Sequence, residues 1–237
     1  MGSSLPPLVR LGPVPSGMPG PWGLPAAAVL GYLIGTTPSA DVAARLASGG
    51  TVDLRSSGSG NPGGANAYTV LGPRWGAVVI GADIAKGAVA SGVGRALAGG
   101  AGGYVAGTAS VIGHCFPIWT RGRGGKGVGA SVGQCLATFP AYFPIDIAVA
   151  GVTSTARWRG RARAATMLSS VLWVLGGVLW WRRRWPNLWG PEPTALLPLT
   201  NLVSSVVIAY RFLSVPNPTL PPTEPKTRTS EPDGPAH

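Results

Sequence analysis

The sequence predicts an all-α, polytopic membrane protein with about seven transmembrane helices and glycine-rich loops on the cytoplasmic side. The chain has 237 residues, of which 45% are hydrophobic and only 11% are charged, whereas a soluble domain carries about 25% charged residues. The mean hydropathy is +0.26, and the apolar residues gather in long windows with few charges. This composition argues against a soluble globular domain, and it is too apolar for a chain that is disordered over most of its length.

Six apolar windows are long enough to cross a bilayer, which takes about 20 residues of helix. They are residues 24–46, 71–98, 101–119, 127–156, 164–181 and 193–210. The fourth window has 30 residues, too many for one span, and Pro140 and Pro144 are able to break it into two. The predicted number of spans is therefore seven, or six if this window is a single kinked helix.

Proline-rich segments flank these windows. Residues 1–25 contain seven prolines, and residues 214–237 also contain seven. We therefore expect a flexible N-terminal segment at residues 1–23, a membrane domain at residues 24–213 and a disordered tail at residues 214–237.

The excess of positive charge has two interpretations. Nineteen Lys and Arg residues against eight Asp and Glu residues give a net charge of +11, which suits either a nucleic-acid-binding protein or a membrane protein with basic cytoplasmic loops. The low total charge favours the second, so no nucleic acid is expected as a partner. Seven spans put thirteen Lys and Arg residues on one side and five on the other, which predicts that the first side is cytoplasmic. Arg182, Arg183 and Arg184 lie on the side with fewer basic residues. Either their side chains snorkel to the headgroups, or the span count is off by one.

The first polar motif combines Arg55 with the glycine-rich residues 58–66. Such a loop either turns its N–H groups toward an anion or is only a flexible connection between helices. Its candidate site residues are Arg55, Gly58, Ser59, Gly60, Asn61 and Asn66.

The second motif places Asp83 and Lys86 three residues apart inside an apolar window. Residues at this spacing share one face of a helix. Ionisable side chains inside a membrane span usually face a polar interior. The pair is thus either part of a functional site, including an ion path, or a structural pair that neutralises itself.

The third motif begins at His114 and ends in a basic, glycine-rich run. The run contains Arg121, Arg123, Gly124, Gly125, Lys126 and Gly127. Exposed N–H groups and basic side chains together make a phosphate cradle, although the run also suits an anchor for lipid headgroups. His114 is either a packed polar residue or a catalytic group. No metal site is expected, because His114 and Cys115 are adjacent and rarely point at one ion.

Together these motifs resemble the bacterial acyl-phosphate:glycerol-3-phosphate acyltransferase family, of the PlsY type. The resemblance covers residues 24–135 in order and spacing, and its most specific elements are residues 58–66 and 122–127. It implies a seven-span fold in the plasma membrane, with the motif loops meeting at the cytoplasmic face. It also implies transfer of a fatty acyl group from acyl phosphate to the sn-1 hydroxyl of glycerol 3-phosphate. The product is lysophosphatidate, for phospholipid synthesis.

The resemblance implies particular site residues and partners. The catalytic candidates are His114, Lys126 and Asn66; the substrate-binding candidates are Arg55, Gly58, Ser59, Gly60, Asn61, Lys86, Arg123, Gly124, Gly125 and Gly127. The partners are acyl phosphate, glycerol 3-phosphate and the lipid bilayer, and neither a metal nor another cofactor is expected. Because acyl phosphate is already activated, positioning and electrostatic stabilisation suffice for much of the catalysis, and His114 is expected to orient a ligand.

The C-terminal half departs from the family pattern. Two serines that the family has within residues 157–163 are absent here, and a His and an Asn are missing around Tyr210. An inactive or regulatory relative that binds a phosphorylated ligand or phospholipid therefore stays open as an alternative to an active acyltransferase. A second alternative is a small membrane transporter, because Asp83 and Lys86 inside a span would suit an ion path.

Overall fold

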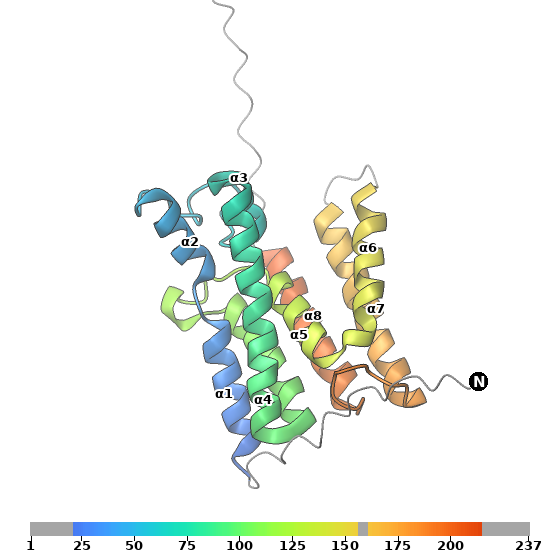
Figure 1. Ribbon diagram of the computed structural model, residues 1–237. Coiled ribbons are helices and arrows are strands. Elements are labelled where there is room, and N and C mark those ends of the chain that lie inside the picture. Colours follow the sequence, from blue (N-terminus) through green and yellow to red (C-terminus); the bar gives the residue numbers. More distant parts are fainter. Residues whose placement is uncertain (1–20, 156–160, 215–237) are drawn as a thin grey trace, which may run out of the picture.

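The structure is a computed structural model that describes residues 21–155 and 161–214 (Figure 1). The predicted N-terminal segment up to residue 20, the predicted tail from residue 215 and the connection at residues 156–160 lie outside the described residues. Within those residues the only regular secondary structure is helical. They are α1 (Gly23–Gly35), α2 (Ser39–Ser48), α3 (Gly64–Leu71), α4 (Pro73–Cys115), α5 (Val128–Thr138), α6 (Phe143–Thr155), α7 (Arg161–Arg183) and α8 (Leu196–Ser214), with two short 3₁₀ helices, η1 (Ile118–Thr120) and η2 (Pro140–Tyr142).

The first apolar window contains two helices instead of one. Helix α1 ends at Gly35 and α2 begins at Ser39. Pro38 lies in the break, where it has no N–H to donate to the preceding turn and so ends a continuous helix. The window at residues 24–46, which was counted as one span, therefore contains two helices, and the break leaves backbone carbonyls available for side chains.

Helix α4 consists of two antiparallel arms. Its backbone is non-helical at Ala98 and at Gly99, where φ is +62°, a value that glycine adopts without strain. The chain reverses there, so the first arm (residues 73–97) and the second arm (residues 100–115) run side by side (Figure 1). The predicted boundary between the second and third apolar windows is confirmed.

The long fourth window is also broken, as predicted. Helix α5 and the segment that begins at Pro140 meet at an angle of 111°. By length and composition, three helices of the described residues qualify as membrane spans, and the bent pair is a fourth candidate. The expectation of about seven spans is thus met only in part.

Helix packing depends on small residues. A Cβ at Gly35 of α1 would overlap the Ser110 carbonyl of the second arm of α4, and a Cβ at Gly133 of α5 would overlap the Ile84 carbonyl of the first arm. Backbones approach this closely where glycine faces the neighbouring helix, as is common between membrane helices. Much of the high glycine content therefore serves packing.

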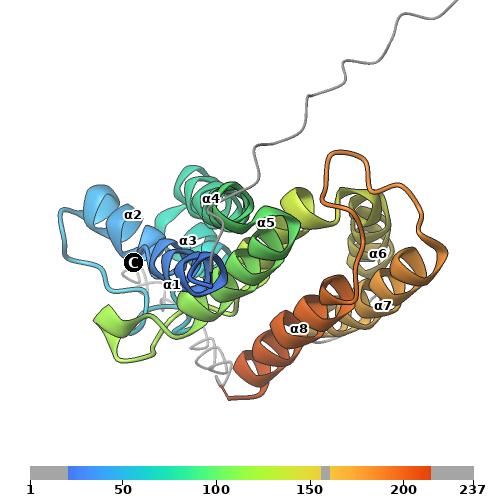
Figure 2. The same ribbon diagram turned by 90° about the horizontal axis from the view of Figure 1, so that it is seen from below.

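A buried polar network joins three helices in the interior. Gln134 of α5 is fully buried; its Nε2 donates to Thr108 of α4 at 3.0 Å, and its Oε1 accepts from Ser204 of α8 at 2.8 Å. Such bonds between membrane helices contribute on the order of 1 kcal/mol each. Figure 2 shows α6 and α7 on the far side of α5 and α8 from the α1–α4 group.

The loops between the helices gather at two opposite ends of the molecule. Helices α2 and α3 and the loop at residues 116–127 lie toward one end, which we call the motif end (Figure 1). The turn at Gly99 and the loop at residues 184–195 lie at the opposite end, where Arg95 donates to the Trp189 carbonyl at 2.8 Å. All three sequence motifs reach the motif end.

Candidate functional site

The Asp83 carboxylate is the centre of a buried polar cluster. Ser39 Oγ donates to Asp83 Oδ1 at 2.5 Å, Lys86 Nζ lies 2.9 Å from the same oxygen, and His114 Nδ1 lies 3.5 Å from it. The side chains of Asp83, Lys86 and His114 are at most 7% exposed. The expected Asp83–Lys86 pair is therefore present, and it is part of a larger cluster that also joins α2 and the end of α4.

The break between α1 and α2 completes the surroundings of Lys86. Lys86 Nζ donates to the Thr37 carbonyl at 3.2 Å. This carbonyl is available because the helix ends before Pro38. A buried ammonium group needs such partners, because its transfer from water is otherwise costly.

Two glycines allow the loop that follows α4 to pack closely against His114. The Gly125 N–H donates to the His114 carbonyl at 3.2 Å. A Cβ at Gly125 would overlap His114 Nε2, and a Cβ at Gly124 would overlap the His114 carbonyl. The ring therefore has Asp83 on its Nδ1 side and the glycine loop on its Nε2 side.

Arg55 joins three segments of the motif end. Its Nη1 and Nη2 donate to the two Asp41 carboxylate oxygens at 2.5 Å and 3.1 Å. Its Nε donates to the Arg123 carbonyl at 3.1 Å. The arginine side chain is 24% exposed and the Asp41 side chain 33%, so water or a ligand reaches both.

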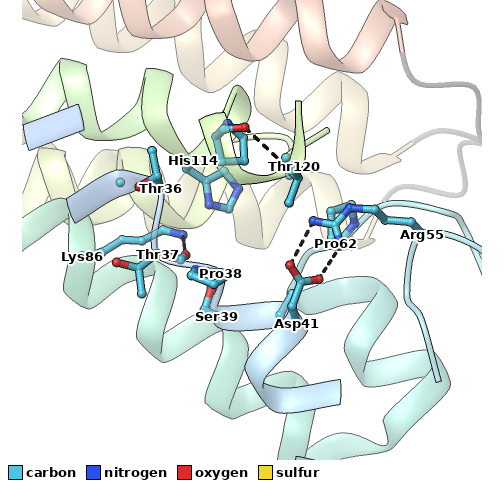
Figure 3. Close-up of a pocket in the computed structure, with 15 residues that line it drawn as sticks. Thr36, Thr37, Pro38, Ser39, Asp41, Arg55, Pro62, Lys86, His114 and Thr120 are labelled. Atoms are coloured by element: carbon cyan, nitrogen blue, oxygen red, sulfur yellow. Dashed lines mark hydrogen bonds and ion pairs between the residues drawn. The ribbon is translucent and has the colours of Figure 1, made fainter. Parts of the chain in front are cut away.

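These groups line one pocket at the motif end. Its lining comprises Gly35, Thr36, Thr37, Pro38, Ser39, Ala40, Asp41, Arg55, Pro62, Lys86, His114, Pro117, Thr120, Gly124 and Gly125. Figure 3 shows Lys86 and Arg55 on opposite sides, with His114 between them. Five of the predicted site residues, Arg55, Lys86, His114, Gly124 and Gly125, are therefore brought together.

Eight predicted site residues lie off the pocket lining. They are Gly58, Ser59, Gly60, Asn61, Asn66, Arg123, Lys126 and Gly127. Asn66 is buried and holds its own loop: its Nδ2 donates to the carbonyls of Leu54 and Ser57 at 2.9 Å and 3.0 Å, and its Oδ1 accepts from the Ser59 N–H at 2.8 Å. The Ser59 N–H group is therefore used inside the loop.

Gly58 and Gly60 give the same loop its shape. Their φ angles are +59° and +69°, in the region where glycine is unstrained. A Cβ at Gly58 would also overlap Asn66 Oδ1. The glycine-rich motif at residues 58–66 is thus a tightly bonded support beside the pocket.

Lys126 lies beside α8 and is not among the residues that line the pocket. Its Nζ lies 4.6 Å from the centroid of the Phe212 ring. Burial, followed by the charge of Arg211, lowers the pKa of Lys126 from its ordinary value. The predicted catalytic role of Lys126 therefore has no direct support in this geometry.

Three residues that the motifs did not single out complete the site. Arg211 of α8 donates through Nε to the Gly125 carbonyl at 3.1 Å, and through Nη2 to the Gly124 carbonyl. Ser39 and Asp41 bond to Asp83 and Arg55. The sequence signal for Ser39 and Asp41 was their place within three residues after Pro38. Arg211 was one basic residue at the end of an apolar window.

Comparison with known proteins agrees with the resemblance carried by the motifs. The model of the family described as "Glycerol-3-phosphate acyltransferase" matches residues 25–215. The glycerol-3-phosphate acyltransferase of Bacillus velezensis is 42% identical over 121 residues, which cover 51% of this chain and 62% of that protein. The one of Thermoanaerobacter sp. strain X514 is 34% identical over 154 residues, which cover 65% of this chain and 76% of that protein.

The fold is similar to that of PlsY, an integral membrane glycerol 3-phosphate acyltransferase. Its crystal structure in the glycerol 3-phosphate form has a TM-score of 0.63 and 24% identity, and the match covers 80% of this chain and 88% of that chain. The lysophosphatidic acid form has a TM-score of 0.62 and 23% identity.

The chain spans 62% of the length of the Bacillus velezensis relative and 55% of that of the Exiguobacterium sibiricum relative. The family match, by contrast, extends over nearly the whole described region. The chain has the fold of an integral membrane protein, and three helices of its described residues are long and apolar enough to cross a membrane. It belongs to the glycerol-3-phosphate acyltransferase family.

Proposed function

We propose that this chain transfers a fatty acyl group from acyl phosphate to the sn-1 hydroxyl of glycerol 3-phosphate, giving lysophosphatidate. The observation that carries this proposal is the pocket with Lys86 and Arg55 on opposite sides and His114 between them. Both substrates carry phosphate, and a guanidinium group binds phosphate with two parallel hydrogen bonds. The family membership supports the same reaction.

In the proposed reaction, the hydroxyl oxygen attacks the carbonyl carbon of acyl phosphate. The new ester C–O bond forms while the bond from this carbon to the phosphate oxygen breaks, and inorganic phosphate leaves with the electron pair. The hydroxyl proton passes to a phosphate oxygen. Since the leaving group is already good, the protein contributes mainly position and charge.

His114 orients the hydroxyl in this proposal. Asp83 Oδ1 on the Nδ1 side of the ring, at 3.5 Å, favours the tautomer with hydrogen on Nδ1, because the partner of one ring nitrogen sets the state of the other. Nε2 then accepts a hydrogen bond from the substrate hydroxyl. Arg211, through the Gly125 carbonyl, and Asn66, through its own loop, position the pocket walls without touching substrate.

We further propose seven passes through the plasma membrane with the motif end at the cytoplasmic face. The passes are α1, the two arms of α4, α5, α6, α7 and α8, whose alternating directions support this arrangement (Figure 1). The distribution that seven spans predict from the sequence, thirteen Lys and Arg residues on one side against five on the other, supports the orientation. Helix α1 has 13 residues and extends about 20 Å, less than the ~30 Å hydrocarbon core, so the pocket at its end is within reach of both lipid and water.

Acyl transfer is tested with purified protein in detergent. We expect phosphate release from palmitoyl phosphate that depends on added glycerol 3-phosphate and equals the lysophosphatidate formed. Arg55→Ala is the matched loss-of-function control, because it removes one cation from the pocket. Absence of release that depends on glycerol 3-phosphate, from protein that still binds this substrate, would support the inactive-relative alternative and overturn the proposed activity.

The orientation is tested with a cysteine at position 121, after Cys115 and Cys135 are replaced. Both native cysteines are free and buried, and Arg121 is an exposed residue of the loop at residues 116–127. We expect Arg121→Cys to be protected from an impermeant thiol reagent in intact cells and labelled after lysis. Labelling in intact cells would place the motif end outside.

A further inference from the structure

The opposite end of the molecule carries a basic and aromatic surface that the acyl-transfer reaction does not use. Helix α7 ends in Arg182 and Arg183, and Arg184 follows with a φ of +52°. All three arginines are exposed. Together with Trp181, Trp185, Leu188 and Trp189 they form what we call the Arg–Trp surface, which lies away from the motif end (Figure 1).

The arginines of this surface have no acidic partner among the described residues. None of the ion pairs in that part of the chain includes Arg182, Arg183 or Arg184. Glu192 is the one acidic residue in the loop at residues 184–195. At the motif end, by contrast, the pocket cations are paired with carboxylates. The Arg–Trp surface therefore presents uncompensated positive charge to its surroundings.

The loop that carries this surface is firmly held. Asn187 is buried, and its Nδ2 donates to the carbonyls of Thr138 and Pro191 at 2.9 Å and 2.8 Å. Trp189 Nε1 donates to the Leu136 carbonyl at 2.7 Å, and the Arg95 guanidinium donates to the Trp189 carbonyl at 2.8 Å. The loop is thus fixed to α4 and α5.

The apolar side chains on this fixed loop nevertheless point outward. Leu188 is 66% exposed and Trp189 60%. Trp185 packs edge-on against Trp180, with ring centroids 4.9 Å apart, yet remains 40% exposed. Large exposed tryptophans at a helix end are typical of the level of lipid headgroups, where one part of the ring is apolar and the other is wet.

We propose that the Arg–Trp surface binds the headgroups of anionic phospholipids in the leaflet opposite to the pocket. The guanidinium fork matches phosphate oxygens and is weakly hydrated, while Trp185, Leu188 and Trp189 enter the boundary of the acyl chains. The charge complementarity favours anionic over zwitterionic lipid. It also accounts for three arginines on the side where the chain otherwise has few basic residues. This inference does not depend on the proposed acyl transfer.

The test compares lipid affinities by native mass spectrometry of the full chain in detergent, titrated with phosphatidylglycerol or phosphatidylcholine. We expect wild-type protein to bind phosphatidylglycerol about 100-fold more tightly than phosphatidylcholine. The triple variant Arg182→Gln, Arg183→Gln, Arg184→Gln should lose about 100-fold in affinity for phosphatidylglycerol, which is roughly fivefold per arginine. Its affinity for phosphatidylcholine should not change.

The matched control is the triple Arg→Lys variant at the same positions, which keeps the charge and should retain most of the preference. Both variants should melt close to the wild type in phosphatidylcholine, because these side chains are exposed. High salt should weaken the binding of phosphatidylglycerol to wild-type protein as an independent measurement. Equal affinity of the wild type for the two lipids, or a loss below fivefold in the Gln variant, overturns the proposal.

Discussion

The third motif, which runs from His114 at the end of α4 to Gly127 before α5, has a pocket side and an α8 side that differ in chemical character. On the pocket side, His114 lines a cavity and lies 3.5 Å from the Asp83 carboxylate. On the α8 side, Lys126 lies over the Phe212 ring, outside the pocket lining. Polar groups that converge on an accessible pocket are typical of a binding or catalytic site, whereas a cation stacked on an aromatic ring is typical of a structural contact.

This difference shows that residues adjacent in a glycine-rich motif need not serve the same site. Gly124 and Gly125 line the pocket, and Lys126 directly after them does not. Gly127 has a φ of +88° and begins the turn into α5, so the chain leaves the pocket within two residues. Substitutions on the two sides should therefore have very different effects, and the following predictions test this.

The largest effect is expected for Lys86→Met. Removal of one partner from a buried ion pair costs about 3–5 kcal/mol, because the remaining charge is left uncompensated. Asp83 would keep its hydrogen bond from Ser39 and its contact with His114 but lose its cationic partner at 2.9 Å. We expect a loss of this size in the free energy of unfolding, measured by denaturant titration in detergent.

The double variant Asp83→Asn, Lys86→Met is the control for this prediction. It removes both charges, so most of the stability should return while acyl transfer stays impaired. If Lys86→Met alone is as stable as wild-type protein, the pair is not the buried centre of the site.

The second largest effect is expected for His114→Ala, whose kcat/KM should fall by about 10- to 100-fold. A neutral hydrogen bond that orients a ligand is worth about tenfold, and a positioned general base about 10²–10⁴-fold. His114→Gln should recover part of the loss, because an amide still orients a hydroxyl but is no base. A loss beyond about 1,000-fold, without rescue by Gln, would make His114 a general base.

The pocket side was largely predictable from sequence because charges inside apolar windows are few and costly. Asp83, Lys86 and His114 stand out against long uncharged runs, and the structure brings them around one carboxylate oxygen. The reversal of α4 at Gly99 also coincides with a predicted window boundary. Such features are local, so sequence alone exposes them.

The remaining features depend on tertiary proximity and could not be predicted in this way. Arg211 reaches the Gly125 carbonyl across 86 residues of chain, and nothing in its local sequence indicates this partner. The helix break at Pro38 was not predicted, because residues 24–46 were counted as one apolar window although residues 39–48 are less apolar than residues 24–35 and carry Asp41 and Arg45. Asp41 was passed over as an ordinary charge at the end of that window.

A smaller effect of opposite sign is expected for Asp41→Asn. Asp41 occupies both terminal nitrogens of Arg55, so a substrate phosphate must compete with it. Partly exposed ion pairs contribute at most about 1 kcal/mol, and we therefore expect the KM for glycerol 3-phosphate to fall about three- to fivefold. Asp53 is the matched control, since it lies 4.0 Å from Arg55, is 60% exposed and does not line the pocket.

Comparison of the two aspartate variants shows whether Asp41 competes with the substrate phosphate for Arg55 or holds Arg55 in its binding position. Asp53→Asn should leave the KM unchanged. A raised KM in Asp41→Asn would mean that the carboxylate holds Arg55 in its binding position, and the idea of competition with substrate would then fail.

The smallest effect is expected for Lys126→Ala, although the motif alone points to this residue as catalytic. Its Nζ contacts the Phe212 ring on the α8 side, and the loop carbonyls before it are already held by Arg211. Substitutions away from buried networks typically change energies by about 0.5 kcal/mol or less, so we expect the KM of either substrate to change by less than about twofold. Phe212→Leu is the paired variant, because it removes the ring and keeps the charge. A tenfold or larger rise in one KM for Lys126→Ala, with Phe212→Leu unchanged, would show that Lys126 binds a substrate phosphate and that the α8 side of the loop belongs to the site.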